Sequence, residues 1–337
     1  MDLETLGWNS LFEKHFEPYK KKGFIPARIA LEERTLYTAY SELGELTGKV
    51  TGRFRHNARS RSDYPVVGDW VAIKGNPDTG KMSIHGVLPR KSKFSRKISA
   101  TEGRITEEQI ISSNIDTVFL VIALDADFNI RRIERYLSIV QESGANLVVV
   151  LNKMDICQNV VEYIKKVKSI TRGIPIYAVS ALENIGIEQL DTYLSEGQTV
   201  TLVGSSGAGK STLINSILGE DRQATGDVRE YDGKGRHITI KRELIQLPGG
   251  GLVIDNPGMR SISLWGEKGL DETFEDIVAL SKQCKFKDCQ HKTEPGCAIK
   301  KAIKDGTLDK ERYRNYLKLQ RELRILAMKK EKRARVR

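Results

Sequence analysis

One eight-residue string, Gly204-Ser-Ser-Gly-Ala-Gly-Lys-Ser211, constrains the fold of this chain more than any other stretch. It has the G-x-x-x-x-G-K-S spacing of a phosphate-binding loop. An apolar, β-branched run at residues 199–203 predicts a buried strand before it, and residues 210–218 predict a helix after it. Glycines let backbone N–H groups turn inward around phosphate oxygens, where the helix N-terminus adds positive charge. This strand, loop and helix therefore predict a nucleoside triphosphate site.

The residues around this loop have distinct expected roles in holding phosphate and Mg²⁺. Lys210 is expected to reach the β- and γ-phosphates, and the Ser211 hydroxyl to ligate Mg²⁺. After a further apolar run at residues 252–254, Asp255 is expected to hold Mg²⁺ through water, and the N–H of Gly258 to contact the γ-phosphate. The expected phosphate-contacting residues of the loop are Gly204, Ser205, Ser206, Gly207, Ala208, Gly209, Lys210, Ser211 and Thr212.

A second string, Asn152-Lys-Met-Asp155, indicates which base is bound. It follows apolar residues 146–151, so it lies at the carboxyl end of an expected strand, where ligands bind in open α/β sheets. The Asp155 carboxylate can accept from the N1–H and the exocyclic amine of guanine, a donor pair that adenine lacks. Asn152 can tie this loop to the phosphate-binding loop, and the Lys153 stem can cover the base. The string therefore predicts binding of GTP and GDP.

A third string, Ser180-Ala-Leu182, follows an expected strand at residues 175–179. Here a backbone N–H, from Ser180 or Ala181, is expected to meet the guanine oxygen. Both guanine-reading strings precede the phosphate-binding loop, whereas an ordinary small GTPase has them after it. This order predicts a circular permutation, which can keep the same sheet because the termini of a compact domain often lie close together.

The group that would activate water is not obvious from the sequence. Many small GTPases carry a water-orienting glutamine where this chain has Met259, and methionine cannot orient water by hydrogen bonding. His237 is the candidate, in the glycine-rich stretch at residues 233–239, with Thr239 as the expected switch threonine on Mg²⁺. The alternative is that His237 is only a solvent-exposed loop histidine. The expected catalytic residues are His237, Thr239 and Lys210.

The formal net charge of +11 is unevenly distributed along the 337 residues. Residues 99–275 carry a net negative charge, whereas the regions on both sides are basic. This segregation favours a polyanionic partner, with nucleic acid as the first choice. The sequence has no run of 18 or more apolar residues and does not start with a signal peptide, so we expect a cytoplasmic monomer without membrane contact.

The N-terminal 98 residues predict a helix and a small barrel. Residues 1–20 form an amphipathic pattern, and five short strands are then expected at residues 25–31, 35–40, 46–54, 70–74 and 82–88. Five short strands of this kind suggest an OB-fold, with an SH3-like barrel as the alternative. The basic residues 53–61 are either a phosphate clamp, which the charge segregation favours, or a solvated loop. Residues 89–97 are expected to be a basic linker.

Strands and helices then alternate, with a strand expected at residues 115–124 and helices at 130–143 and 160–171. This alternation predicts a mostly parallel sheet. Near the C-terminus, Cys284, Cys289, His291 and Cys297 offer three thiols and an imidazole within 14 residues. Such a set predicts a closed, structural Zn²⁺ site, and the metal would stabilise a segment too short to fold alone. Cys157 is expected to be a small structural residue.

Residues 309–337 predict one long helix that ends in a basic tail. The tail either contacts RNA and becomes ordered on binding, or is a solvated, frayed end. The expected layout is therefore multidomain. It comprises an N-terminal helix and OB-fold RNA-binding barrel (1–98), a circularly permuted α/β P-loop GTPase domain (99–270), and a zinc-binding α-helical domain with a basic C-terminal helix (271–337).

The permuted order, the phosphate-binding loop, Asp255-Asn-Pro-Gly258 and the Cys-x₄-Cys-x-His-x₅-Cys set resemble the bacterial ribosome small-subunit-dependent GTPase A family. The resemblance implies a late assembly factor of the small ribosomal subunit whose GTPase activity rises on the subunit. Members commonly carry His-Thr-Thr in the switch, whereas this chain reads His237-Ile-Thr239.

From these features we expect a GTP hydrolase that binds the small ribosomal subunit through ribosomal RNA and acts in its maturation. One alternative is an RNA-binding nucleotide switch with little intrinsic turnover. Another is a GTP-dependent enzyme that modifies RNA, which is disfavoured because GTP and zinc already account for every recognisable chemical residue.

Overall fold

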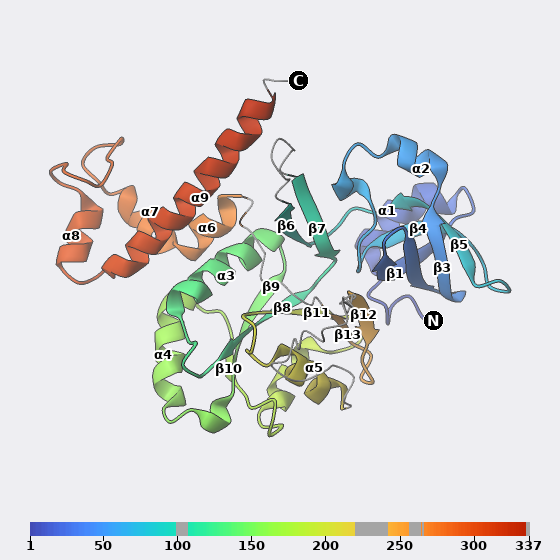
Figure 1. Cartoon of the computed structure of the whole chain (residues 1–337), viewed down its shortest axis with the longest axis horizontal. Coiled ribbons are helices and arrows are strands. Elements are labelled where there is room, and N and C mark those ends of the chain that lie inside the picture. Colours follow the sequence, from blue (N-terminus) through green and yellow to red (C-terminus); the bar gives the residue numbers. More distant parts are fainter. Residues whose placement is uncertain (99–106, 220–241, 256–263, 265, 335–337) are drawn as a thin grey trace, which may run out of the picture.

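The computed structural model describes residues 1–98, 107–219, 242–255, 264 and 266–334. Figure 1 shows a β-barrel at the N-terminal end, a central α/β layer, and a helical region that ends in one long helix. Within the described residues, no helix combines the length and apolar character needed to cross a membrane.

The first helix, α1 (Ser10–Lys20), is shorter than the predicted helix over residues 1–20. Asn9 has an extended backbone, and its side chain accepts from the N–H groups of Leu11 and Phe12, which makes it the N-cap. Before it, Gly7 has a φ of +84°, and a Cβ there would lie 2.7 Å from the carbonyl oxygen of Gly197. The first residues therefore form a turn packed against the central layer, which the helical pattern alone did not show.

Five strands close into a barrel in the order β1-β2-β3-β5-β4, with β4 pairing back onto β1. Their bounds are β1 (Ile25–Glu33), β2 (Leu36–Ser41), β3 (Gly44–Val50), β4 (Trp70–Asn76) and β5 (Lys81–Val87). The β3–β5 pair is parallel and the others are antiparallel. This closed five-stranded barrel confirms the predicted OB-fold. The segment between β3 and β4 carries the short helices α2 (Gly52–Asn57) and η1 (Arg61–Asp63).

The predicted basic linker at residues 89–97 is wrong, because β6 (Lys93–Ile98) pairs there with β7 (Glu107–Ser113). Phe94 is buried and anchors the strand, and Ser95 beside it is buried as well. The Nζ of Lys93 lies 2.9 Å from a carboxylate oxygen of Glu108. Basic residues at positions 93, 96 and 97 conceal the strand in the sequence, because they interrupt the apolar pattern that would predict it.

The central sheet has the order β10-β9-β8-β11-β13-β12, parallel except for the edge strand β12. Its strands are β8 (Thr117–Ala123), β9 (Asn146–Asn152), β10 (Ile176–Ala178), β11 (Thr199–Val203), β12 (Glu243–Gln246) and β13 (Leu252–Asp255). Every residue of β8 is buried, and its alternate side chains belong to two different apolar clusters. Such a strand is covered on both faces, as the predicted strand–helix alternation requires.

Two of the connecting helices have the predicted bounds, α3 (Ile130–Ser143) and α4 (Val160–Thr171), and α5 (Lys210–Leu218) follows the phosphate-binding loop. Asn129 caps α3 by accepting from two backbone N–H groups, and Gly144 ends the helix in the left-handed conformation. These local signals fix the helix at both ends, which explains why the sequence located it accurately.

The barrel and the central sheet are continuous, because β12 pairs with β1 at Leu31 and Glu243. At the same junction the buried Arg28 donates to the backbone carbonyls of Leu6, Gly68 and Asn114. These three carbonyls belong to the N-terminal turn, the barrel and the segment that leads into β8. Burial lowers the pKa of Arg28 to about 10, although Asp116 and Asp69 act in the opposite direction.

The C-terminal region consists of α6 (Lys268–Thr273), α7 (Glu275–Ser281), α8 (Ala298–Lys304) and α9 (Lys310–Ala334). Arg312 of α9 is buried and donates to Glu134 of α3 at 2.6 Å and to Asp276 of α7 at 3.0 Å. A second pair, Arg135 with Glu322, joins the same two helices through bonds of 2.7 and 3.0 Å. The predicted long C-terminal helix is therefore present, and α3 is the surface on which it docks (Figure 1).

Replacement of Arg28 tests the junction between barrel and sheet. Arg28→Met keeps the aliphatic bulk and leaves three buried carbonyls without their donor. We expect the free energy of unfolding in urea to fall by about 3 kcal/mol, since each unsatisfied buried group costs about 1–3 kcal/mol. Arg321→Met, at an exposed position of α9, is the control and should change stability by less than about 0.5 kcal/mol. Equal stability of the two variants would show that the Arg28 contacts contribute nothing.

Candidate nucleotide and metal sites

The phosphate-binding loop joins β11 to α5, and its backbone requires glycine at two close approaches. Gly204 lies where a Cβ would be 2.1 Å from the carbonyl oxygen of Val121. Gly209 has a φ of +86°, and a Cβ there would be 2.2 Å from Nδ2 of Asn152. The first and last glycines of the loop therefore let it pack against β8 and against the Asn152 loop. This close packing is the physical reason for glycine at both positions.

The Lys210 ammonium lies over the loop rather than in solvent. Its Nζ donates to the carbonyls of Gly204 at 3.1 Å and Ser205 at 2.6 Å. Ser211 and Thr212 follow in the first turn of α5, both partly buried. The lysine therefore sits at the mouth of a ring of backbone N–H groups, where an anionic phosphate can attract it.

Asn152 ties three strand-end loops together, as its position in the sequence suggested. Its Nδ2 donates to the carbonyl of Ala208 at 2.9 Å, and its Oδ1 accepts from the N–H of Ala181 at 3.0 Å. Asn152 is 2% exposed, so these bonds are shielded from water. Ser180 pairs with Ile185 through two backbone bonds of 2.9 Å, which closes the third loop.

Lys153 has a left-handed backbone conformation, with a φ of 66°. Its Nζ lies 2.9 Å from a carboxylate oxygen of Asp125. Burial alone would raise the pKa of Asp125, but hydrogen bonding to Lys153 and to the N–H of Asp127 lowers it, which favours the carboxylate. Asp155 follows in the short helix η2 (Met154–Ile156), where its side chain is exposed. Asp125 was missed in the sequence because its partner is 28 residues away; its only signal was its place just beyond a predicted strand.

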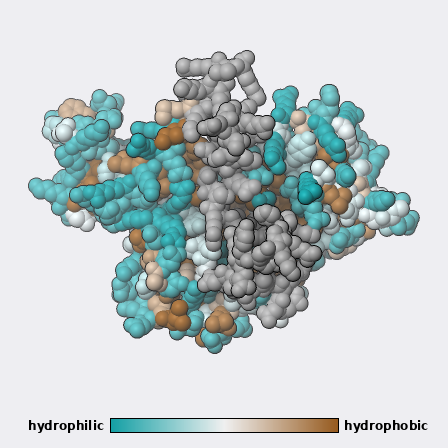
Figure 2. Space-filling view, viewed as in Figure 1, coloured by the Kyte–Doolittle hydropathy of each residue, from teal (hydrophilic) through white to brown (hydrophobic). Residues whose placement is uncertain are grey.

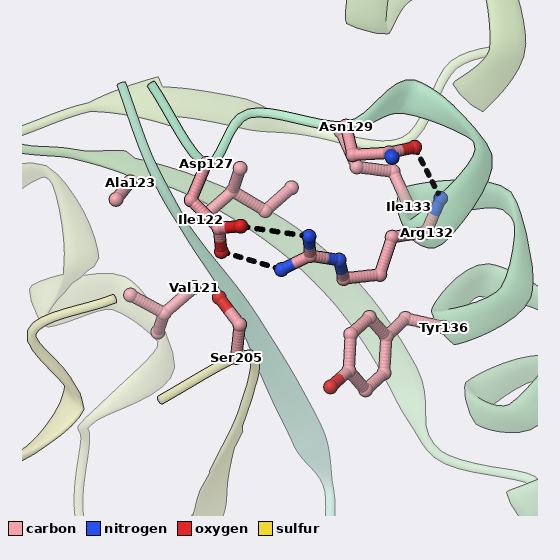
Figure 3. A pocket seen from close by; sticks show the side chains of 9 residues that line it. All are labelled: Val121, Ile122, Ala123, Asp127, Asn129, Arg132, Ile133, Tyr136 and Ser205. Atoms are coloured by element: carbon pink, nitrogen blue, oxygen red, sulfur yellow. Dashed lines mark hydrogen bonds and ion pairs between the residues drawn. The ribbon is translucent and has the colours of Figure 1, made fainter. Parts of the chain in front are cut away.

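A small pocket beside the phosphate-binding loop is closed by a second ion pair (Figure 3). Asp127 accepts two bonds from the guanidinium of Arg132, at 2.5 and 2.8 Å. The side chains of Ser205 and Tyr136 line the same pocket. Hydrogen bonding to Arg132 is the largest cause that lowers the pKa of Asp127, and hydrogen bonding to the Ser205 hydroxyl is a smaller one. Asp127, held by Arg132 in the first turn of α3, thus lies against Ser205 of the phosphate-binding loop, an arrangement that the sequence did not reveal.

Asp255 ends β13, the strand next to β11, and is therefore at the same edge of the sheet as the phosphate-binding loop. Its carboxylate and the Ser211 hydroxyl are oxygen donors of the kind that Mg²⁺ prefers. Three predicted residues, His237, Thr239 and Gly258, lie outside the described residues, as does Met259. The roles assigned to individual residues of this site stay predictions.

The four predicted metal ligands converge between α7 and α8. The ligand atoms of Cys284, Cys289, His291 and Cys297 all lie within 4.8 Å of one another. Nδ1 of His291 is 3.5 Å from Sγ of Cys284 and 3.4 Å from Sγ of Cys297. Three thiolates and one imidazole fit a tetrahedral ion with no position left for substrate, which is the donor set of a structural Zn²⁺.

A carboxylate outside this set shapes the ligand loop. Glu294 accepts backbone N–H bonds from Gln290 and Lys292, both at 2.8 Å, and from Thr293 at 3.0 Å. Its own N–H and that of Gln290 are the largest causes that lower the pKa of this carboxyl to about 2. His291, between these donors, has a φ of 58°, which points its ring back towards the cysteines. Glu294 is therefore an organising residue of the metal loop that composition alone did not identify.

The sheet is mostly parallel and carries a phosphate-binding loop after β11, while the Asn152 and Ser180 loops end strands that precede it in the chain. This arrangement defines a circularly permuted P-loop GTPase. Comparison with known proteins agrees. The model of the RsgA GTPase family matches residues 87–265. The chain is 47% identical to the small ribosomal subunit biogenesis GTPase RsgA of Opitutus terrae, over 96% of this chain and 90% of that protein. The corresponding protein of Syntrophotalea carbinolica is 41% identical, over 100% and 93%.

Solved structures show the same architecture. YjeQ from Thermotoga maritima matches with a TM-score of 0.66 and 27% identity, over 89% of this chain and 98% of that chain. YloQ, described as a circularly permuted GTPase, matches with a TM-score of 0.62 and 24% identity, over 89% and 95%. The chain belongs to the RsgA GTPase family, and it is a GTP hydrolase.

Two glycines at the ends of α5 give a matched test of the phosphate-binding loop. Gly209→Ala places a methyl group on the Asn152 amide, so we expect GTP affinity to fall by at least about tenfold, as loss of one buried hydrogen bond implies. Gly219→Ala is the control, because Gly219 has a φ of +70° but no heavy atom within 4 Å of an added Cβ. It should lower stability and leave affinity unchanged. Titration with a fluorescent GTP analogue measures both, and equal affinities would contradict the packing argument.

Metal analysis tests the cysteine–histidine cluster. We expect one Zn²⁺ per chain by elemental analysis, and its loss in Cys289→Ser but not in Cys157→Ser, since Cys157 lies far from the cluster in sequence. Glu294→Gln should retain the metal but release it faster to a chelator, because the neutral amide accepts the loop N–H groups more weakly. A fully folded wild-type chain without metal would overturn the assignment.

Proposed function

We propose that this GTP hydrolase acts in the late assembly of the small ribosomal subunit, binds the subunit through its ribosomal RNA, and hydrolyses GTP faster when bound. The observation that carries the proposal is the match along nearly the whole chain to proteins named small ribosomal subunit biogenesis GTPase. The segregation of basic residues to the two ends of the chain supports the RNA contact. In this proposal the protein acts as a monomer in the cytoplasm, with its three parts divided at residues 98 and 270.

The nucleotide is assigned to the loops that Asn152 joins. Asp155, Lys153 and the Ser180–Ala181 turn are proposed to read guanine, while residues 204–212 hold the phosphates. The contacts of Asn152 with both sets of loops support this arrangement, because they fix the base site relative to the phosphate site. Ser211, Thr239 and Asp255 are proposed to hold Mg²⁺, which neutralises charge on the phosphates when bound.

Before the nucleotide binds, Lys210 is held by the loop carbonyls of Gly204 and Ser205. We propose that the β- and γ-phosphates replace these carbonyls as its partners, since a charged oxygen is the stronger acceptor. The ammonium then stabilises the charge that develops on the transferred phosphoryl group. The loop therefore needs little rearrangement of its backbone to receive GTP.

Water activation is the step for which the chain lacks an obvious group, because Met259 replaces the usual glutamine. We propose that His237 orients the attacking water and that docking on the small subunit brings it into position. Turnover of the isolated chain should then be slow, near the ~10⁻⁴–10⁻³ s⁻¹ of unassisted small GTPases.

The proposed partner contacts are the barrel and the C-terminal helix, with Zn²⁺ stabilising the segment between α7 and α8. Ion pairs from α3 to α9 connect the C-terminal helix to α3, whose Arg132 holds Asp127 beside the phosphate-binding loop. Docking through the C-terminal helix therefore has a route of contacts to the phosphate-binding loop. The alternative, an RNA-binding switch with little turnover, predicts no phosphate release even with saturating small subunits.

Single-turnover GTP hydrolysis with saturating small subunits tests both the function and the histidine. We expect stimulation by the wild-type chain, and in His237→Ala the loss of most of the stimulated rate with normal binding of GTP and of the subunit. Lys210→Ala, in contrast, should lose nucleotide affinity itself. If His237→Ala keeps the stimulated rate, the histidine is a bystander; if the wild type releases no phosphate even with saturating small subunits, the switch alternative is correct.

A further inference from the structure

The barrel carries a groove that neither the nucleotide site nor the metal cluster uses. It has a volume of about 540 Å³, within the range of small-molecule sites, and lies between α2 and the end of β5. Arg53, Phe54 and Asn57 form one wall, and Tyr19 from the end of α1 closes it. Figure 1 shows α2 at the outer end of the barrel, away from α5 and from α8.

The walls of this groove are held in place by contacts within the chain. Arg90 donates to the carbonyls of Ser62 and Tyr64, at 2.8 and 2.9 Å, and is itself fixed by the fully buried Asp69. Asp63 accepts from the N–H groups of Arg59 and Ser60, at 2.8 and 2.9 Å. The segment between β3 and β4 therefore has a defined conformation. A ligand that binds there would cause little further loss of conformational entropy.

The same segment presents four exposed guanidinium groups without an ion pair among the described residues, although Arg61 interacts electrostatically with Glu32. Arg53, Arg55, Arg59 and Arg61 are exposed, and their side chains form no ion pair within the residues that the structure describes. Elsewhere the arginines of α3 behave differently, since Arg131, Arg132 and Arg135 are each paired with a carboxylate. Unpaired arginines concentrated beside one groove indicate an anionic ligand that comes from outside the chain.

The interior of the groove suits a planar, aromatic group. Phe54 is half-buried and packs edge-to-face on Tyr64, with ring centroids 5.8 Å apart, so its orientation is fixed. Tyr19 packs against the backbone of β5, since a Cβ on Gly86 would lie 2.3 Å from the hydroxyl of Tyr19. The amide of Asn57 is exposed at the rim and can both donate and accept.

Proteins that recognise single-stranded RNA stack an unpaired base on an aromatic side chain and hydrogen-bond to the edge of that base. This groove offers aromatic rings, an amide and neighbouring arginines for these contacts. We propose that this groove binds one unpaired RNA nucleotide, with its base against Phe54 and Tyr19 and its neighbouring phosphates on the arginines of residues 53–61. An acidic protein segment would satisfy the arginines but would leave the aromatic groove empty. The inference rests on the proposed contact with ribosomal RNA and names its chemistry.

Three short RNAs test the base contact directly on the full chain. The first is a duplex with one bulged adenosine, the second carries an abasic residue at the bulge, and the third is the perfect duplex. All three have nearly the same phosphate charge. We expect the adenosine bulge to bind about tenfold tighter than the abasic bulge by fluorescence anisotropy, as stacking of one base implies. Equal affinities would overturn the proposal.

Two variants separate the base from the phosphates. Ala58→Met, which fills the groove from α2, should abolish the preference for the adenosine bulge and leave the abasic duplex unaffected. Arg55→Glu should weaken binding of all three RNAs and reduce the dependence of affinity on salt. Lys168→Glu on α4 makes the same charge change at another exposed position and should alter none of these affinities. A preference that survives Ala58→Met would place the base elsewhere and overturn the proposal.

The experiments distinguish an error in the groove proposal from an error in the proposed ribosomal function. If the chain sediments with small subunits but shows no preference for the adenosine bulge, only the groove proposal is wrong. If it does not sediment with small subunits, the ribosomal function is wrong. Displacement of all three RNAs by polyglutamate, with no base preference, would assign the arginines to an acidic protein partner instead.

Discussion

The buried guanidinium of Arg28 is the interaction on which the arrangement of the molecule depends. A charged group with no carboxylate in direct contact is expensive to bury, and here three backbone carbonyls compensate for the lost water. Those carbonyls come from segments 22, 40 and 86 residues away in the chain. The barrel can therefore take only one position on the central sheet without leaving a donor or acceptor unsatisfied. The pairing of β12 with β1 then extends one sheet across the junction.

A second set of buried charges organises the opposite end of the molecule around α3. Glu134 is fully buried and is shared by Arg131, Arg312 and Asn315, so it joins α3 to α9. Two residues before Glu134, Arg132 holds Asp127 beside the phosphate-binding loop. The helix α3 thus bonds directly to the C-terminal helix and, through Asp127, is connected to the phosphate-binding loop. Because a buried charge pair tolerates little displacement, movement of either partner must be accommodated by α3 as a whole.

The sequence predicted the features that depend on neighbouring residues. The phosphate-binding loop, the bounds of α3 and α4, and the short-spaced cysteine–histidine cluster all follow from local spacing, caps and periodicity. Features created by distant contacts were missed or wrong. Strand β6 is hidden because Phe94 is its buried anchor among basic residues, and α1 is shorter because Gly7 packs on a carbonyl of residue 197. Asp125 binds Lys153, 28 residues away, whereas Asp127 and Glu294 bind near neighbours and were missed because no sequence pattern marks those contacts.

The continuous sheet also affects how the folded chain behaves towards other copies of itself. Unpaired strand edges are templates for β-aggregation, and an isolated central sheet would expose β12 as such an edge. Here β1 pairs with β12 at Glu243, at one end of that four-residue strand, and the barrel closes on itself through β4. At the opposite border of the central sheet, the edge strand β10 is only three residues long. The strands at both borders are therefore short, which limits the length of edge that another copy could extend.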